Sequence, residues 1–287
     1  MNDDQLINKN FHTFQRNKII KDKDRFIYRE ISNRINLSLE NINLTVTDCL
    51  EIGFSSNSTY SYISSRFKKI NYAVLDISKK NLERDNLEKK LICHDHDKWI
   101  LKENEFDLII SNFYLHLTND FDLLLSNINS SLKKNGFFIA AIPSINCFHE
   151  IKDCMIQADL EMYEGAYRRF KELLNVEKIS QILKKNNYKI PVIEIDTIEL
   201  RYKEFNKLLN DIRYLGNSYV YKDRKKKFEH KNYFKTVEDI YWKKYSNKNQ
   251  LILSLEIIII TGWKEDPSQQ IPLKPGEAKI SLKDFLQ

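Results

Sequence analysis

Strand-like and helix-like patterns alternate along residues 46–142. Short apolar runs predict buried strands at 46–53, 72–76, 91–93, 106–112 and 137–142. Helical patterns lie between them, at 58–67 and at about 120–133, and Ser78 suits the N-cap of a third helix. Strands that alternate with helices in this way are typical of a parallel, doubly wound sheet. The pattern therefore predicts an α/β fold.

Helical patterns dominate on either side of this region. Apolar residues recur at three- and four-residue steps from about Phe14 to Leu37, which predicts one basic helix. After Pro143, helices are expected at about 144–164, 176–187, 205–215 and 225–245, and strands at 192–200 and 251–261. We expect one domain at 46–266 with helical insertions at about 144–187 and 203–245. A helical cap at 1–45 precedes it, and an extended tail at 267–287 follows it.

Length and apolar content favour a single domain outside the membrane. The 287 residues contain no Pro-, Gly- or Ser-rich linker, and a chain of this length can bury one large core. The strongest apolar run, 251–262, is interrupted by Ser254 and Glu256 and is too short to span a membrane. The first residues contain no apolar signal segment. The sequence therefore predicts a cytoplasmic protein.

Charge and cysteine patterns argue against nucleic-acid and metal binding. The net charge is only +6, and the basic run at 222–227 is expected to be a solvated helix start, because no stacking aromatics alternate with its charges. No CxxC pair is present, and His94 and His96 point to opposite sides of an extended chain. We expect no metal site and four buried, reduced thiols: Cys49, Cys93, Cys147 and Cys154.

Polar residues follow the predicted strands at the edge where ligands bind to parallel sheets. Asp76, after the second strand, can accept both hydroxyls of a ribose, and Asp95, after the third, can accept an adenine amino group. Glu51, at the end of the first strand, can meet an ammonium group. An Asp at a strand end is equally often a helix cap. Three carboxylates in register favour a nucleoside ligand with a cationic amino acid attached, and the other expected contacts are Gly53, Ser111 and Asn112.

These same segments resemble the ordered motifs of class I S-adenosylmethionine (SAM)-dependent methyltransferases. The resemblance spans roughly 48–142 and rests on LEIG at 50–53, LD at 75–76, Asp95, FDLIISN at 106–112 and LKKNG at 132–136. It implies a Rossmann-like fold with a mostly parallel, seven-stranded sheet and SAM as cofactor. In that family pattern Glu51 holds the methionine amino group, Asp76 the ribose and Asp95 the adenine.

Two branches of that superfamily resemble the chain further. The block FDLIISNFYLHLTND at 106–120 is similar to the biotin-pathway malonyl-carrier-protein methyltransferase and to the respiratory complex I assembly factor that hydroxylates an arginine. The segments 14–16, 211–216 and 261–263 and the tail 268–276 are similar to the assembly factor. The resemblance therefore favours bacterial relatives of the assembly factor, with a complex I subunit or another protein as partner. Carboxyl methylation of a malonyl carrier protein is the alternative.

The glycine loop departs from the family pattern. It reads EIGFSSN at 51–57, so Gly53 is retained, but Ser55 and Asn57 replace the second and third glycines. These glycines allow the backbone to approach the ligand closely and to adopt positive φ. We expect Ser55 to remain a weakened cofactor contact. A binding or assembly protein that has lost turnover is the second hypothesis.

Several other positions carry open alternatives. His116 is either a catalytic base or a packed histidine. Arg168, Arg169 and Arg213 either line a substrate pocket or are solvated. Trp242 and Trp263 are expected in the core. Tyr219 stands where the assembly factor has an asparagine, and only Gly165 remains of its glycine-pair segment.

Overall fold

The computed structural model describes residues 6–18, 25–83, 89–163, 165–216, 219–225 and 228–269. Five strands run parallel in the order β3-β2-β1-β4-β5. The strand β8 lies antiparallel between β5 and β6, which completes the order β3-β2-β1-β4-β5-β8-β6. The strand bounds are β1 Asp48–Ile52, β2 Asn71–Asp76, β3 Lys90–Cys93, β4 Phe106–Asn112, β5 Leu132–Pro143, β6 Lys189–Tyr202 and β8 Gln250–Trp263. The predicted α/β fold with a mostly parallel sheet is confirmed, but the described sheet has eight strands and not the expected seven.

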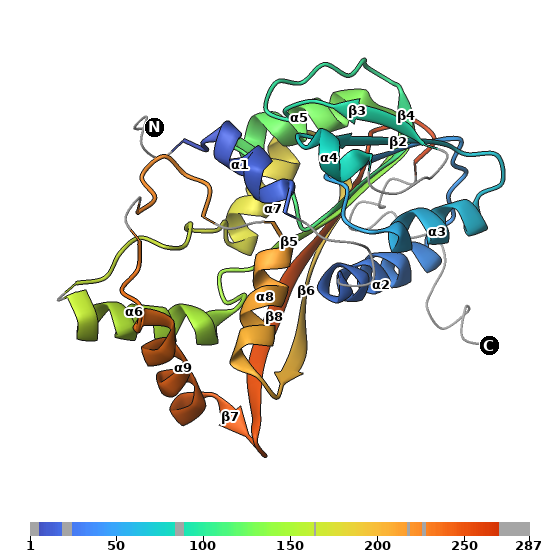
Figure 1. Ribbon diagram of the computed structural model, residues 1–287. Helices are drawn as coiled ribbons and strands as arrows, with labels where there is room; N and C mark the ends of the chain where they lie inside the picture. Colours follow the sequence, from blue (N-terminus) through green and yellow to red (C-terminus); the bar gives the residue numbers. More distant parts are fainter. Residues whose placement is uncertain are drawn as a thin grey trace, which may run out of the picture.

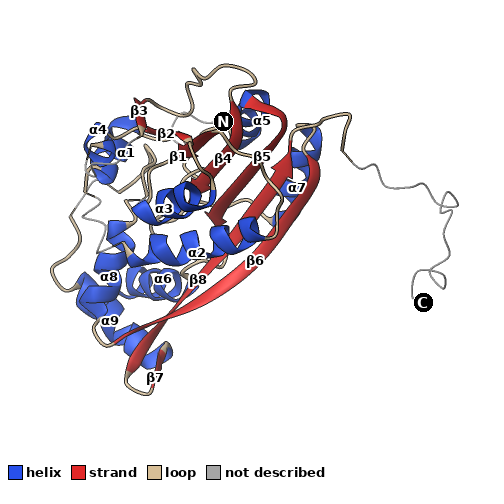
Figure 2. Ribbon diagram, turned by 90° about the vertical axis from the view of Figure 1, so that its right-hand side faces the viewer, coloured by secondary structure: helices blue, strands red, loops and turns tan. Residues whose placement is uncertain are grey.

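An eighth short strand in the described part of the chain, β7 (Ser246–Asn247), pairs only with β8. It belongs to the far end of the long β6–β8 ladder, which extends well beyond the parallel strands (Figure 2).

Helices cover both faces of the sheet (Figure 1). The side chains of β5 contribute alternately to two hydrophobic cores, one on each face of the sheet, because successive side chains of a strand point to opposite faces. Phe137 and Ile139 pack with the core that includes α2, α6 and α9, and Phe138 and Ala140 pack with the core that includes α5 and α7. The helix bounds are α1 Lys9–Arg16, α2 Phe26–Glu40, α3 Asn57–Arg66, α4 Lys79–Leu82, α5 Phe121–Ser131, α6 His149–Tyr163, α7 Val176–Lys185, α8 Phe205–Tyr214 and α9 Tyr233–Lys244.

Three predicted helices differ from the observed ones. The single helix predicted at 14–37 is wrong: α1 ends at Arg16 and α2 begins at Phe26. The helix predicted from 144 begins at His149, because Ser144 bonds to Glu256 of β8 and Phe148 adopts a φ of 58° that no α-helix contains. The helix predicted from 225 begins at Tyr233, and the described part of the basic run, 222–225, is a turn and not a helix start.

The thiol prediction is correct for three cysteines. Cys49, Cys147 and Cys154 are buried, but Cys93 is exposed, because β3 is the edge strand among the strands that the structure describes. All four are free thiols. Trp242 and Trp263 are partly buried against the core, as expected. The tail is described only to residue 269, so residues 270–276 of the predicted tail match lie outside the described residues. Within the described ranges, no helix is long and apolar enough to cross a membrane.

Candidate functional site: a carboxylate edge and a neighbouring cavity

The carboxylates predicted at the strand ends lie at one edge of the sheet. Glu51 is the second-last residue of β1 and pairs in register with Val74 of β2. Asp76 is the last residue of β2, and Asp95 follows β3. Glu51 and Asp76 bind the same loop: Asp76 Oδ2 accepts from the Phe54 amide at 3.0 Å, and Glu51 Oε1 accepts from the Ser55 amide at 3.2 Å. Strand order β3-β2-β1 therefore brings the three acidic positions into adjacent places, as the parallel sheet requires.

The glycine loop is closed against a tyrosine. Gly53 has a φ of +80°, and a Cβ atom built on it would lie 2.1 Å from Cγ of Tyr114. The Tyr114 ring thus occupies the space into which the loop faces. Ser55, which replaces the second glycine of the family pattern, donates its hydroxyl to Glu51 at 3.0 Å. The replacement therefore satisfies a carboxylate that is itself fully buried.

The helix α1 places one cationic side chain against Asp76 and another against Asp95. The Arg16 guanidinium pairs with Asp76, donates to the Phe54 carbonyl at 2.8 Å and donates to the Tyr28 hydroxyl at 3.1 Å. The Lys9 ammonium contacts Asp95 at 2.7 Å. Figure 1 shows α1 beside α4, near the ends of β2 and β3. The single helix α1 therefore supplies positive charge to Asp76 and Asp95, two of the three carboxylates predicted to bind the cofactor.

Burial makes the Arg16–Asp76 pair sensitive to loss of either partner. The side chains are 1% and 0% exposed. Although desolvation opposes the charge on Arg16, the Asp76 carboxylate raises the pKa of the guanidinium above its usual value. At Glu51, burial raises the pKa of the carboxyl above its ordinary value despite the bonds from Ser55 and Tyr72. Removing one member of a buried pair strands the other charge without compensation.

The carboxylates have the chemistry that a nucleoside ligand needs, but in this conformation other groups of the protein occupy the positions that the ligand would take. The carboxylates offer the acceptors that ribose and adenine groups need. Their acceptor positions are taken by Arg16, Lys9 and backbone amides, and Tyr114 fills the region beside Gly53. A ligand at this edge therefore requires α1 to move away.

The other predicted contacts serve the fold here. Ser111 donates its hydroxyl to the Ile52 carbonyl at 2.7 Å. The Asn112 amide donates to the Tyr28 carbonyl at 3.0 Å and to the Ser32 hydroxyl at 2.9 Å, which ties β4 to α2. Both side chains are buried at the expected edge.

Three residues that the sequence interpretation did not assign to the site complete it. His12 of α1 lies 5.7 Å from the Tyr114 ring, and His96 lies 4.9 Å from the same ring, both between ring centroids. His96 also contacts the Leu117 carbonyl at 2.9 Å. Together with Arg16 they form a buried cluster between α1 and the segment after β4. The family-like Phe14-Gln15-Arg16 motif was the available signal for α1.

Buried histidines should make the protein less stable at acidic pH. Burial first, and then His96 and Arg16, hold the pKa of His12 well below 6.5. Burial and Lys171 lower the pKa of His116 to about 3. Below about pH 6.5 these histidines take up protons in the unfolded chain but not in the folded protein. The free energy of unfolding therefore decreases as the pH is lowered from about 6.5 toward the pKa values that the histidines have in the folded protein. Each histidine contributes up to about 1.4 kcal/mol per pH unit.

Urea unfolding at about pH 7.5 and about pH 5 measures this slope. The variant His12→Phe, which keeps a ring against Tyr114, should reduce the loss of stability on acidification. An unchanged slope in the variant would contradict a neutral, buried His12.

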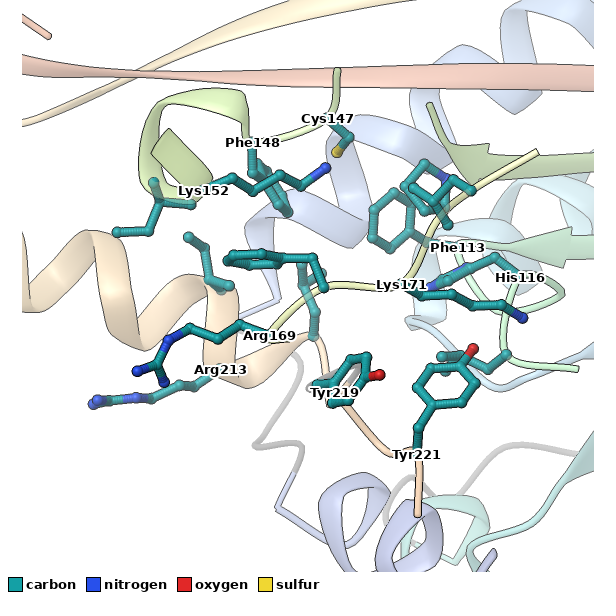
Figure 3. Close-up of a pocket in the computed structure, with 17 residues that line it drawn as sticks. Phe113, His116, Cys147, Phe148, Lys152, Arg169, Lys171, Arg213, Tyr219 and Tyr221 are labelled. Atoms are coloured by element: carbon teal, nitrogen blue, oxygen red, sulfur yellow. The ribbon is translucent and has the colours of Figure 1, made fainter. Parts of the chain in front are cut away.

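A cavity of about 190 Å³ adjoins the carboxylate edge at the ends of β4 and β5 (Figure 3). His116 lines it, and its Nδ1 atom is buried without a hydrogen-bond partner. His116 is therefore neither solvated nor bonded at that atom. The apolar wall is formed by Phe113, Leu117, Pro143, Cys147, Phe148, Ile151, Phe170, Leu173, Ile212 and Leu215, and the polar wall includes Lys152, Arg169, Lys171, Arg213, Tyr219 and Tyr221.

The predicted arginines take different places. Arg169 lines the cavity, but its guanidinium contacts Asp159 at 2.5 Å and Glu229 at 2.8 Å. Arg213 also lines it, and Arg168 is half exposed and lies 3.5 Å from Asp223. In Figure 3 the guanidinium groups of Arg169 and Arg213 extend to the same side. Arg169 therefore holds the wall together, and Arg168 lies outside the cavity lining.

The histidines beside Asp95 do not share a site. His96 is buried under Tyr114, whereas His94 is half-buried and contacts the Asp95 carbonyl. Throughout the residues that the structure describes, no group of three or more His, Cys, Asp or Glu side chains could hold a metal ion.

Known proteins share both the domain and the fold. Residues 50–140 match the family model described as a methyltransferase domain. The chain is 26% identical to the mitochondrial arginine-hydroxylase NDUFAF5 of Dictyostelium discoideum, over 96% of this chain and 69% of that protein. It is 19% identical to malonyl-[acyl-carrier protein] O-methyltransferase of Methylovorus sp., over 91% of this chain and 90% of that protein.

The fold has solved counterparts. A Bacillus halodurans protein assigned as a methyltransferase superposes with a TM-score of 0.55, at 10% identity, over 81% of this chain and 98% of that one. The strand order, the matched domain and these likenesses agree. Residues 50–140 therefore resemble a methyltransferase domain, and the chain has the fold of class I SAM-dependent methyltransferases.

Proposed function

We propose that the protein is a SAM-dependent enzyme that binds its cofactor at the carboxylate edge and modifies an acceptor in the neighbouring cavity. The observation that carries this proposal is the placement of Glu51, Asp76 and Asp95 at adjacent strand ends, with the cavity beside them. Glu51 would hold the methionine amino group, Asp76 the ribose and Asp95 the adenine. SAM, when bound, supplies the methyl group.

The contribution of the protein to such a transfer is alignment. Placing a nucleophile against a sulfonium methyl group needs no covalent intermediate on the enzyme, and proximity supplies most of the rate effect. His116 at the cavity wall is the candidate base for an acceptor that must lose a proton; burial keeps its ring neutral but lowers its pKa to about 3, so it is a weak proton acceptor in this conformation. The likeness to NDUFAF5 supports a protein acceptor, such as a complex I subunit.

A second candidate function is a binding or assembly protein without turnover. The observation that favours it is α1: Lys9 and Arg16 already neutralise Asp95 and Asp76. In this candidate the helix is a permanent internal substitute for the cofactor.

Calorimetric titration with SAM separates the two candidates. Under the enzyme proposal the wild-type protein binds SAM, and Asp95→Ala weakens the affinity roughly tenfold, the scale for losing a hydrogen bond to a charged group. Lys9→Met removes one tether of α1 without touching a carboxylate. It should therefore strengthen SAM binding, in the direction opposite to Asp95→Ala. No heat at millimolar SAM with the wild type and with Lys9→Met would reject the enzyme proposal and leave the assembly candidate.

A further inference from the structure

The cavity carries cations that no acidic side chain of its lining balances. Lys152 and Lys171 both line it, and no Asp or Glu is among its described lining residues. The Lys152 ammonium donates to the Ile145 carbonyl at 3.1 Å, and the Lys171 ammonium donates to the Thr118 carbonyl at 3.3 Å. Neither makes an ion pair with any carboxylate in the described ranges. Each ammonium has three donors, so donors remain for a ligand.

Burial of these two lysines is costly without a counter-ion. Desolvation lowers the pKa of Lys152 and of Lys171 below the usual lysine value. The carboxylates of Glu256 and Asp97 act on them only from a distance and do not offset the burial. An anion in the cavity would supply the missing partner.

A second observation points to the same ligand class. Tyr221 lines the cavity and is 4% exposed, and its hydroxyl has no hydrogen-bond partner. The Lys171 ammonium lies 5.0 Å from the centroid of the Tyr221 ring. Figure 3 shows Lys171, Tyr221 and His116 on the same side of the cavity. An unpaired buried hydroxyl destabilises the folded state unless a ligand pairs with it.

The rest of the wall is apolar, which limits the ligand further. Phenylalanine, leucine, isoleucine and proline side chains make up most of the lining. Pockets of this composition bury an apolar body and use a few polar groups to fix its orientation. The ligand therefore combines an acceptor-rich anionic group with a hydrocarbon portion.

We propose that the cavity binds an organic carboxylate with an apolar chain, and not a guanidinium or ammonium side chain. A carboxylate accepts hydrogen bonds only and suits a wall that offers lysine ammonium and tyrosine hydroxyl donors, whereas an arginine side chain would face like charges. The proposal that the carboxylate binds rests only on the residues that line the cavity. The statement that this carboxylate is the acceptor rests on the proposed function.

The test uses the full chain and the matched probes hexanoate and hexylammonium, titrated by calorimetry without SAM. We expect hexanoate to bind and hexylammonium to give no heat. Lys171→Met and Lys152→Met should each weaken hexanoate binding about tenfold, as for loss of a charged hydrogen bond at a half-buried site. Tyr221→Phe should weaken it by a smaller factor. Lys243→Met, an exposed lysine of α9, is the control for loss of one charge and should leave the affinity unchanged.

Two outcomes overturn the proposal. One is hexylammonium or an arginine-containing peptide binding as tightly as hexanoate. The other is hexanoate affinity that both lysine variants leave unchanged, or that is undetectable in the wild type. Failure of SAM binding would not affect this measurement, and loss of hexanoate binding in a protein that still binds SAM would reject the carboxylate site only.

Discussion

Linking α1 covalently to the turn after β2 is expected to abolish SAM binding, and reduction should restore it. The Ser78 hydroxyl donates to the Asn17 side chain at 2.6 Å, so the double variant Asn17→Cys, Ser78→Cys places two thiols close together. The exposed Cys93 is replaced by Ser in the same protein to prevent side reactions. The oxidised protein keeps Arg16 on Asp76 and Lys9 on Asp95.

The expected effect is large because a ligand binds only the fraction of molecules in which its site is open. A disulfide that removes this open fraction should weaken SAM binding by at least about 100-fold. Calorimetry before and after a reductant measures the change in one sample. Each single cysteine variant, treated identically, is the control and should bind SAM equally with and without reductant.

Equal SAM affinity in the oxidised and reduced double variant would show that α1 does not occupy the cofactor position. Absence of binding in both forms and in the controls would favour the assembly candidate. Reductant-dependent binding would identify α1 as the element that opens the carboxylate edge.

The substitution Gly53→Ala is expected to lower the free energy of unfolding by about 2–5 kcal/mol, the sum of overpacking and of a left-handed backbone for a residue with a Cβ atom. The backbone φ of +80° disfavours alanine, and the new methyl group would lie 2.1 Å from Tyr114 Cγ. Urea unfolding followed by circular dichroism measures the change.

Gly165→Ala is the matched control. No atom lies within 4 Å of the position that its Cβ would take, and its φ is outside the left-handed range. We expect a change near zero, or a slight stabilisation through the unfolded chain. If Gly53→Ala and Gly165→Ala had equal effects, the close approach of Tyr114 to the loop would be wrong.

A third protein, Gly53→Ala with Tyr114→Ala, separates the two causes. It relieves the steric contact but leaves the φ of +80°. Gly53→Ala should therefore be less damaging in the Tyr114→Ala background than in the wild type, by the steric share of the effect.

Much of the sheet was predictable from the sequence, because local patterning determines strand identity. Alternation of strands with helices requires parallel pairing, and parallel pairing places the ends of β1, β2 and β3 at one edge. The positions of Glu51, Asp76 and Asp95 follow from this rule alone. Prediction was wrong where exposure depends on a strand's place in the sheet: the apolar run predicts a buried Cys93, but β3 is the edge strand of the described sheet.

The occupants of the carboxylate edge were not predictable in the same way. Arg16 meets Asp76 across 60 residues of sequence, and Lys9 meets Asp95 across 86. No periodicity encodes such contacts, since they depend on where α1 docks after the sheet has formed. The apolar spacing of 14–37 even suggested one continuous helix, which would have prevented Arg16 from reaching Asp76.

The sequence by itself determined the α/β class, the order of strands and helices and the acidic strand ends, because hydrophobic periods and turn residues act over short distances along the chain. Only the tertiary structure decided what those acidic groups bind. It placed α1 over them, set Tyr114 against Gly53 and gathered unpaired cations around an apolar cavity. These choices depend on burial and charge pairing between segments far apart in the chain, which local patterns do not specify.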